Sequence, residues 1–111
     1  MNVWVENMKS NRTGEPVKNQ MLVHATTDKE EVSTFFSYSA KIFEIYTRDG
    51  KRTIALGEKW DYSATTRRYR DQALERLLGE KVGKKTLEKG LRDGFIVLSG
   101  ANVAVTRDNF Y

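Results

Sequence analysis

The sequence contains no cysteine and only one histidine, His24. Without cysteine the chain cannot form disulfides, a thiolate nucleophile or a cysteine-ligated zinc site, so folding must rest on packing. A single histidine cannot complete a common zinc site alone. A serine triad would also need His24, and no Gly-x-Ser-x-Gly elbow is present. His24 lies inside a β-type run, where we expect a structural role.

Long apolar runs are missing as well. No run approaches the roughly 18 residues needed to cross a bilayer. The start, Met1 to Glu6, has neither the basic residues nor the apolar stretch of a signal peptide. We therefore expect a cytoplasmic protein without membrane contact. Its 111 residues indicate one domain, residues 1–111, with enough chain to bury a single core.

Catalytic and cofactor motifs are scarce. The segment from Gly83 to Thr86 reads Gly-Lys-Lys-Thr and resembles the end of a phosphate-binding P-loop. The preceding glycine, Gly79, is one residue too close, and a helix rather than a strand comes before it. Carboxylates are scattered without an obvious pair. We expect no enzyme activity, no cofactor and no metal.

The strongest element is a helix predicted from Ala64 to Leu78. Hydroxyl side chains suited to an N-cap stand at Ser63, Thr65 and Thr66, and Gly79 suits a left-handed C-terminal position. Apolar spacing of three and four residues defines its buried side, made of Thr66, Tyr69, Ala73, Leu74, Leu77 and Leu78.

Arg70 falls in the middle of this apolar stripe. One interpretation is that its side chain reaches past the core edge to water. The other is a buried pair with Asp61 that fixes the Trp60 loop on the helix start, because a buried arginine needs a partner.

Most of the remaining pattern is β-type. Asp49-Gly50 between two such runs predicts a type I′ hairpin turn. The sequence therefore predicts an α+β fold, an antiparallel β-meander covered on one face by one main and one short helix. The expected strands are Val3–Val5, Met21–Thr26, Val32–Ser39, Lys41–Thr47, Arg52–Leu56 and Phe95–Leu98, with a further strand at Ala101–Val105 left open.

Three segments complete the prediction. Residues 6–20 are polar and contain Gly14 and the only proline, which favours a long loop. A short helix is expected from Lys84 to Asp93, weakened by Gly90 at about 1 kcal/mol relative to alanine. Residues 106–111 are expected to form a tail.

Positive charge is concentrated in the helical half. Residues 65–92 hold nine basic and four acidic side chains. This surplus suits a phosphate backbone or an acidic protein face, although mixed charge on a helix is usually only solvated. Trp60 and Tyr69 are expected to dock the helix on the sheet. The candidate binding residues are Tyr62, Arg67, Arg68, Arg70, Lys84 and Lys85, beside a structural motif of Trp60, Asp61, Ser63, Thr65, Thr66 and Tyr69.

The order of these motifs resembles a family of small uncharacterised proteins of tailed phages and related mobile elements. The matching residues are Asn19-Gln20, Phe36-Ser37-Tyr38, Asp49-Gly50 and the string from Trp60 to Arg70. The match covers about residues 19–98. The chain departs from it in the N-terminal arm and where alanine and leucine replace an expected phenylalanine. The resemblance implies an α+β fold and the cytoplasm of an infected bacterial host, and brings no activity.

Two functions from different classes follow. The first is a non-enzymatic accessory protein that binds a host or phage protein, such as a host-defence or replication component. The alternative is a module that binds DNA or RNA through the basic helical half, residues 65–92. The chain is expected to be a monomer, or a homodimer joined through a sheet edge.

Overall fold

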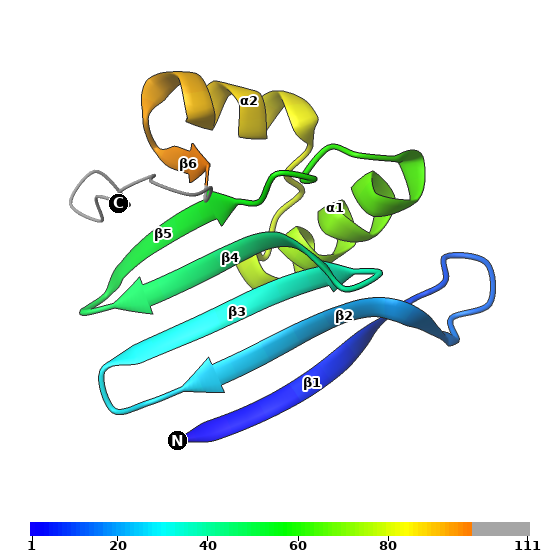
Figure 1. Cartoon of the computed structure of the whole chain (residues 1–111), viewed down its shortest axis with the longest axis horizontal. Helices are drawn as coiled ribbons and strands as arrows, with labels where there is room; N and C mark the ends of the chain where they lie inside the picture. Colours follow the sequence, from blue (N-terminus) through cyan, green and yellow to red (C-terminus); the bar gives the residue numbers. More distant parts are fainter. Residues whose placement is uncertain (99–111) are drawn as a thin grey trace.

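The computed structural model describes residues 1–98, which form one mixed sheet and two helices (Figure 1). Neighbouring strands in the sheet follow the chain order, and all are antiparallel except the last pair. The elements are β1 (Asn2–Lys9), β2 (Pro16–Thr26), β3 (Glu30–Ser37), β4 (Ala40–Arg48), β5 (Lys51–Leu56), α1 (Ala64–Leu78), α2 (Lys84–Asp93) and β6 (Ile96–Leu98).

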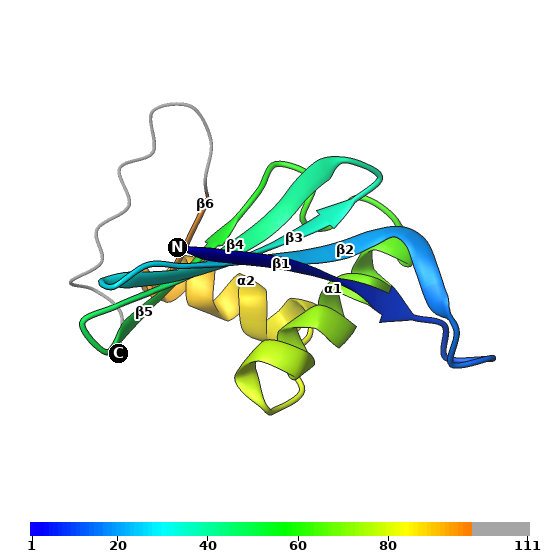
Figure 2. The same ribbon diagram turned by 90° about the horizontal axis from the view of Figure 1, so that it is seen from below.

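Both helices lie on the same side of the sheet (Figure 2). The core lies between them and the sheet side chains that face them, among which Leu22, Phe35 and Phe43 are fully buried. From α1, Leu74 and Tyr69 enter this cluster, and from α2, Leu87. The predicted α+β meander covered on one face is therefore confirmed. Neither helix in the described part of the chain is long and apolar enough to span a membrane.

The ends of α1 are the predicted ones. The Ser63 hydroxyl accepts a hydrogen bond from the Thr66 backbone N–H at 3.1 Å. Gly79 takes a left-handed conformation, φ 78°, and its N–H donates to the Glu75 carbonyl. The helix therefore starts and stops at residues that suit an N-cap and a left-handed C-cap.

Two hairpins of the meander turn through two residues with positive φ. Asp49 and Gly50 have φ of 53° and 76°, as expected for the predicted type I′ turn. Tyr38 and Ser39, with φ of 50° and 71°, join β3 to β4 in the same way. No local pattern predicts this second turn, because neither residue is of a type that favours positive φ.

The prediction of a long loop over residues 6–20 is wrong. β1 and β2 form a hairpin in which Asn7 is paired with Met21 and Lys9 with Pro16, so only residues 10–15 connect them. The segment is polar because β1 lies at the sheet edge and most of its side chains are exposed. Pro16 fits the ladder because it is the first residue of its strand.

The second helix and the strand after it lie close to their predicted positions, but the pairing of that strand is parallel where the sequence predicted an antiparallel meander. α2 ends at Asp93, and the C-cap residue Gly94 is left-handed at φ 80°. β6 then runs parallel to β5, with Ile54 opposite Ile96. The expected strand at residues 101–105 and the tail at 106–111 lie outside the described residues.

Candidate functional site

The start of α1 is organised around Arg70, whose side chain is 1% exposed. Its Nε donates to Asp71 Oδ1 at 2.9 Å, and its Nη1 donates to the Trp60 carbonyl at 2.9 Å and to Asp61 Oδ1 at 3.3 Å. The guanidinium also lies 5.4 Å from the centre of the Trp60 ring. Of the two interpretations, the buried pair with Asp61 is confirmed.

Asp61 gathers positive charge from both helices. Besides Arg70, it pairs with Lys84 at 2.8 Å and more distantly with Arg67 at 3.9 Å. Burial alone would raise the pKa of Asp61, but the hydrogen bond and charge of Lys84, followed by those of Arg70, outweigh it and hold the pKa below 3.8. The carboxylate thus ties the first residue of α2 to the loop that precedes α1.

The hydroxyl groups of the motif form a second set of contacts with the sheet. Thr66 Oγ1 accepts from Ser63 Oγ at 3.1 Å and lies 3.3 Å from Ser37 Oγ on β3. Tyr69 is buried in the core and Trp60 packs against it, as predicted. Trp60, Asp61, Ser63, Thr66 and Tyr69 therefore hold the loop and the helix start in place.

A cavity of about 220 Å³ opens beside this fixed loop. Its walls come from the turn between β3 and β4 and from the segment that leads into α1. Ser37, Tyr38, Ala40, Ile42, Lys59, Tyr62, Ser63, Thr65 and Thr66 line it. Tyr38 and Tyr62 are 64% and 70% exposed, so the cavity has a large aromatic side chain from each of the two segments.

The backbone at Tyr38 is strained. A positive φ is uncommon for a residue with a bulky side chain, and a two-residue turn of this type normally carries glycine, asparagine or aspartate. The Tyr38 N–H donates to the Asn19 carbonyl at 2.8 Å, which helps to hold the turn. Backbone strain of this kind clusters at active sites and ligand-binding sites.

Lys59 adds a cation to the same surface. Its Nζ lies 5.1 Å from the centre of the Tyr62 ring. Sequence reasoning had selected Tyr62 but missed Tyr38 and Lys59. The positive φ at Tyr38 depends on the pairing of the strands on both sides of the turn, and no local sequence pattern predicts this conformation.

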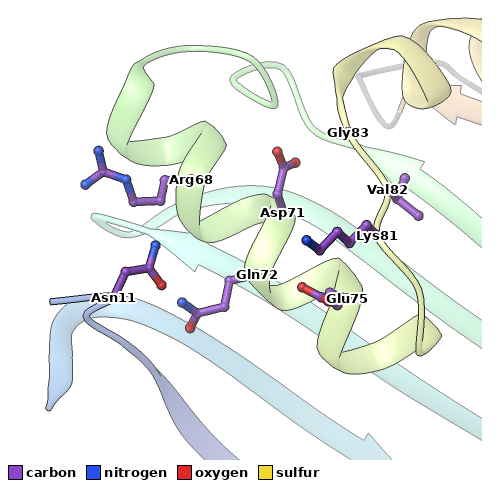
Figure 3. Close-up of a pocket in the computed structure, with 8 residues that line it drawn as sticks. All are labelled: Asn11, Arg68, Asp71, Gln72, Glu75, Lys81, Val82 and Gly83. Atoms are coloured by element: carbon purple, nitrogen blue, oxygen red, sulfur yellow. The ribbon is translucent and has the colours of Figure 1, made fainter. Parts of the chain in front are cut away.

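A second cavity, of about 390 Å³, lies on the outer side of α1 (Figure 3). It runs between the loop that joins β1 to β2 and the linker between the helices. Its lining is Asn11, Arg68, Asp71, Gln72, Glu75, Lys81, Val82 and Gly83. Two cations and two carboxylates share this lining, so its charges largely offset one another, and it does not form a purely basic surface.

The predicted binding residues separate into three groups. Arg70 is buried with its guanidinium bound inside, so its prediction as a surface contact is wrong. The apolar neighbours on its helix face and the loop carbonyl above it account for its burial. Arg67 is partly exposed and Lys84 is exposed, and both pair with Asp61. Tyr62, Arg68 and Lys85 are exposed.

His24 has the structural surroundings expected of it. Its ring nitrogens lie 2.9 Å from Ser33 Oγ and from Glu6 Oε1, and the ring stacks on Trp4. Within residues 1–98 no three acidic or histidine side chains are grouped so that they could hold a metal ion.

Comparison of the chain with protein-family models, with curated proteins and with solved structures found no match.

Proposed function

We propose that this protein acts by binding another protein through the surface around Tyr38 and Tyr62, without catalysing a reaction. The observation that carries the proposal is the pair of exposed tyrosines that line one cavity, one of them on a strained backbone. Tyrosine is enriched among the residues that dominate protein interfaces, because it offers a large rigid surface and one polar group.

Preorganisation supports the same proposal. The loop that carries Tyr62 is attached to α1 through Arg70 and to α2 through Asp61 and Lys84. A side chain on a fixed loop loses little conformational freedom on binding, so more of the contact energy appears as affinity. The resemblance to tailed-phage proteins suggests a protein of the bacterial host, such as a defence or replication component, or another phage protein.

The test is quantitative capture from a nuclease-treated bacterial lysate. The immobilised protein is compared with Tyr38→Ser, Tyr62→Ser and the control Phe95→Ser, which alters an aromatic that is 50% exposed outside the site. We expect each tyrosine variant to retain at least tenfold less of one common partner, and the control to retain it fully. Equal retention by all four proteins would contradict the proposal.

Binding of DNA or RNA through the basic helical half is the second candidate. It is favoured by Arg68, Lys81 and Lys85, which are exposed and form no ion pair within the described part of the chain. It is weakened because Arg67, Lys84, Arg76 and Lys89 pair with carboxylates.

Its test is binding to single- and double-stranded DNA and RNA at about 50 and 200 mM salt. A protein that contacts phosphates loses affinity steeply as the salt concentration rises over this range. Each phosphate contact that is removed lowers the slope of log affinity against log salt concentration by about one. Arg68→Glu with Lys85→Glu should then abolish binding. If this folded double variant binds as the parent does, the basic helical half is not the site.

A further inference from the structure

Strand β1 forms one edge of the sheet (Figure 1). One of its sides is paired with β2, from Asn2 opposite Thr26 to Lys9 opposite Pro16. Its other side meets no strand within residues 1–98. An unpaired edge presents a row of backbone N–H and C=O groups that another strand can use.

The edge is closed at one end only. The Gln72 side chain accepts from the Lys9 N–H at 2.8 Å and donates to the Lys9 carbonyl at 2.8 Å, as a neighbouring strand would. Arg76 from the same helix lies 3.6 Å from Glu6. α1 therefore covers the end of β1 around Lys9. No comparable contact covers Asn2 to Val5 in the described structure.

The open end lacks the usual protection of edge strands. Natural edges carry lysine, proline or inward-pointing charges that deter pairing. Here Val3, Trp4 and Val5 are 58%, 48% and 53% exposed, and the first basic side chain of the strand is Lys9. Within residues 1–98, the edge from Val3 to Val5 is therefore both unpaired on its outer backbone side and apolar in its side chains.

We infer that this edge pairs with the same edge of a second copy of the chain, antiparallel and about a two-fold axis at Trp4. In that register Val3 of each copy lies opposite Val5 of the other on the sheet face away from the helices. Trp4 lies opposite itself on the helix side, and Asn2 lies opposite Glu6. No charge faces a like charge, which would be destabilising.

Other registers match less well. A shift of the axis to Val5 sets Trp4 against Glu6 and Val3 against Asn7. A shift to Val3 sets Trp4 against Asn2. Only the axis at Trp4 places apolar side chains opposite one another on both faces of the sheet. Within each copy, Val3 and Val5 already lie opposite Ala25 and Val23, so the apolar row on that face extends across the dimer. A symmetric dimer of this kind uses one self-complementary surface.

The oligomeric state provides the first test. Sedimentation equilibrium of the full chain from about 1 to 500 μM should show a reversible dimer. Val5→Lys should raise the dissociation constant of the dimer at least tenfold, because the lysine would have no partner of opposite charge in the interface. Phe95→Lys adds the same charge at a similarly exposed site and should leave it unchanged. A monomer throughout, or equal effects of both variants, would overturn the inference.

Cysteine cross-linking tests the register, and the chain has no cysteine of its own to interfere. Opposed residues of an antiparallel pair have Cα atoms about 4.5–5.5 Å apart, within disulfide range, whereas diagonal neighbours about 7–8 Å apart are not. A mixture of Val3→Cys and Val5→Cys proteins should form the mixed disulfide, and each variant alone should not. Equal cross-linking in all three samples, or none, would contradict the register.

This surface is separate from the tyrosine site. Dimerisation can therefore fail while protein capture through Tyr38 and Tyr62 succeeds, and the reverse, so the two sets of experiments test the two proposals independently.

Discussion

At the residue scale, the molecule depends most on one buried cation. Arg70 occupies a position that the helix pattern assigns to an apolar side chain, and four polar contacts with Trp60, Asp61 and Asp71 compensate for its desolvation. Such a network fixes geometry as much as it stabilises, because every group in it has a defined partner.

Replacing Arg70 by methionine should destabilise the fold by about 2–4 kcal/mol, since the Trp60 carbonyl and Asp61 each lose a donor. The free energy of unfolding measured in urea tests this. Arg68→Met makes the same change two residues earlier on the exposed side and should cost less than about 0.5 kcal/mol. Similar losses in both variants would show that the network contributes little.

The lowered pKa of Asp61 makes part of the stability depend on pH. Because its pKa is lower in the folded than in the unfolded chain, its contribution is complete well above 3.8 and is lost as pH falls through the folded value. Asp61→Asn should therefore be less stable than the parent at pH 7, with a smaller difference at pH 3. A difference that stays constant between these pH values would contradict the assignment.

Gln20 is the clearest unsatisfied side chain. It is fully buried on β2, and neither its amide oxygen nor its nitrogen has a hydrogen-bond partner within the described residues. Removing a buried polar group of this kind should stabilise the fold, so we expect Gln20→Met to raise the free energy of unfolding by about 1 kcal/mol. A loss of similar size in thermal or urea unfolding would show that the amide is solvated in solution.

At the element scale, packing in α2 outweighs the helix propensity of one residue. Gly90 weakens the helix by propensity, yet a Cβ placed there would lie 2.4 Å from Ile96 Cδ1 and 2.6 Å from its Cγ1. The close approach lets α2 lie against β6, whose Ile96 is buried.

Gly90→Ala should therefore lower the stability by about 1–2 kcal/mol through overpacking, where helix propensity alone would raise it by about 1 kcal/mol. The free energy of unfolding of Gly90→Ala, compared with that of the parent, shows whether the substitution lowers or raises the stability. Adding Ile96→Val removes the nearest methyl group and should recover part of the loss. A gain in stability from Gly90→Ala alone would mean that β6 moves aside freely.

Elements with their own start and stop signals were predictable from the sequence. α1 has Ser63 and Gly79, and the β4–β5 hairpin has Asp49-Gly50. The β1–β2 hairpin was not predicted, because an edge strand needs only one apolar face and its polar residues have the composition of a loop. The Tyr38 turn and the parallel pairing of β6 depend on contacts between distant segments, which no local pattern contains.

At the scale of the whole molecule, three parts of the surface differ in what covers them. Two helices cover one face, the β1 edge near Val3 to Val5 is paired with no other strand within residues 1–98, and the Tyr38 turn lies beside the start of α1. Five of the nine basic residues in 65–92 form bridges to Asp61, Asp71, Glu6 or Asp93. Net charge is therefore a weaker basis than the exposed tyrosines for proposing a binding surface.

Cross-linking from the tyrosine positions tests the proposed binding surface most directly. A photoreactive phenylalanine derivative is placed at position 38, 62 or 95, and each protein is irradiated in a nuclease-treated bacterial lysate. We predict one protein adduct of the same mass from positions 38 and 62, and none from position 95. The account would be contradicted by no adduct at 38 and 62, or by the same adducts at all three positions.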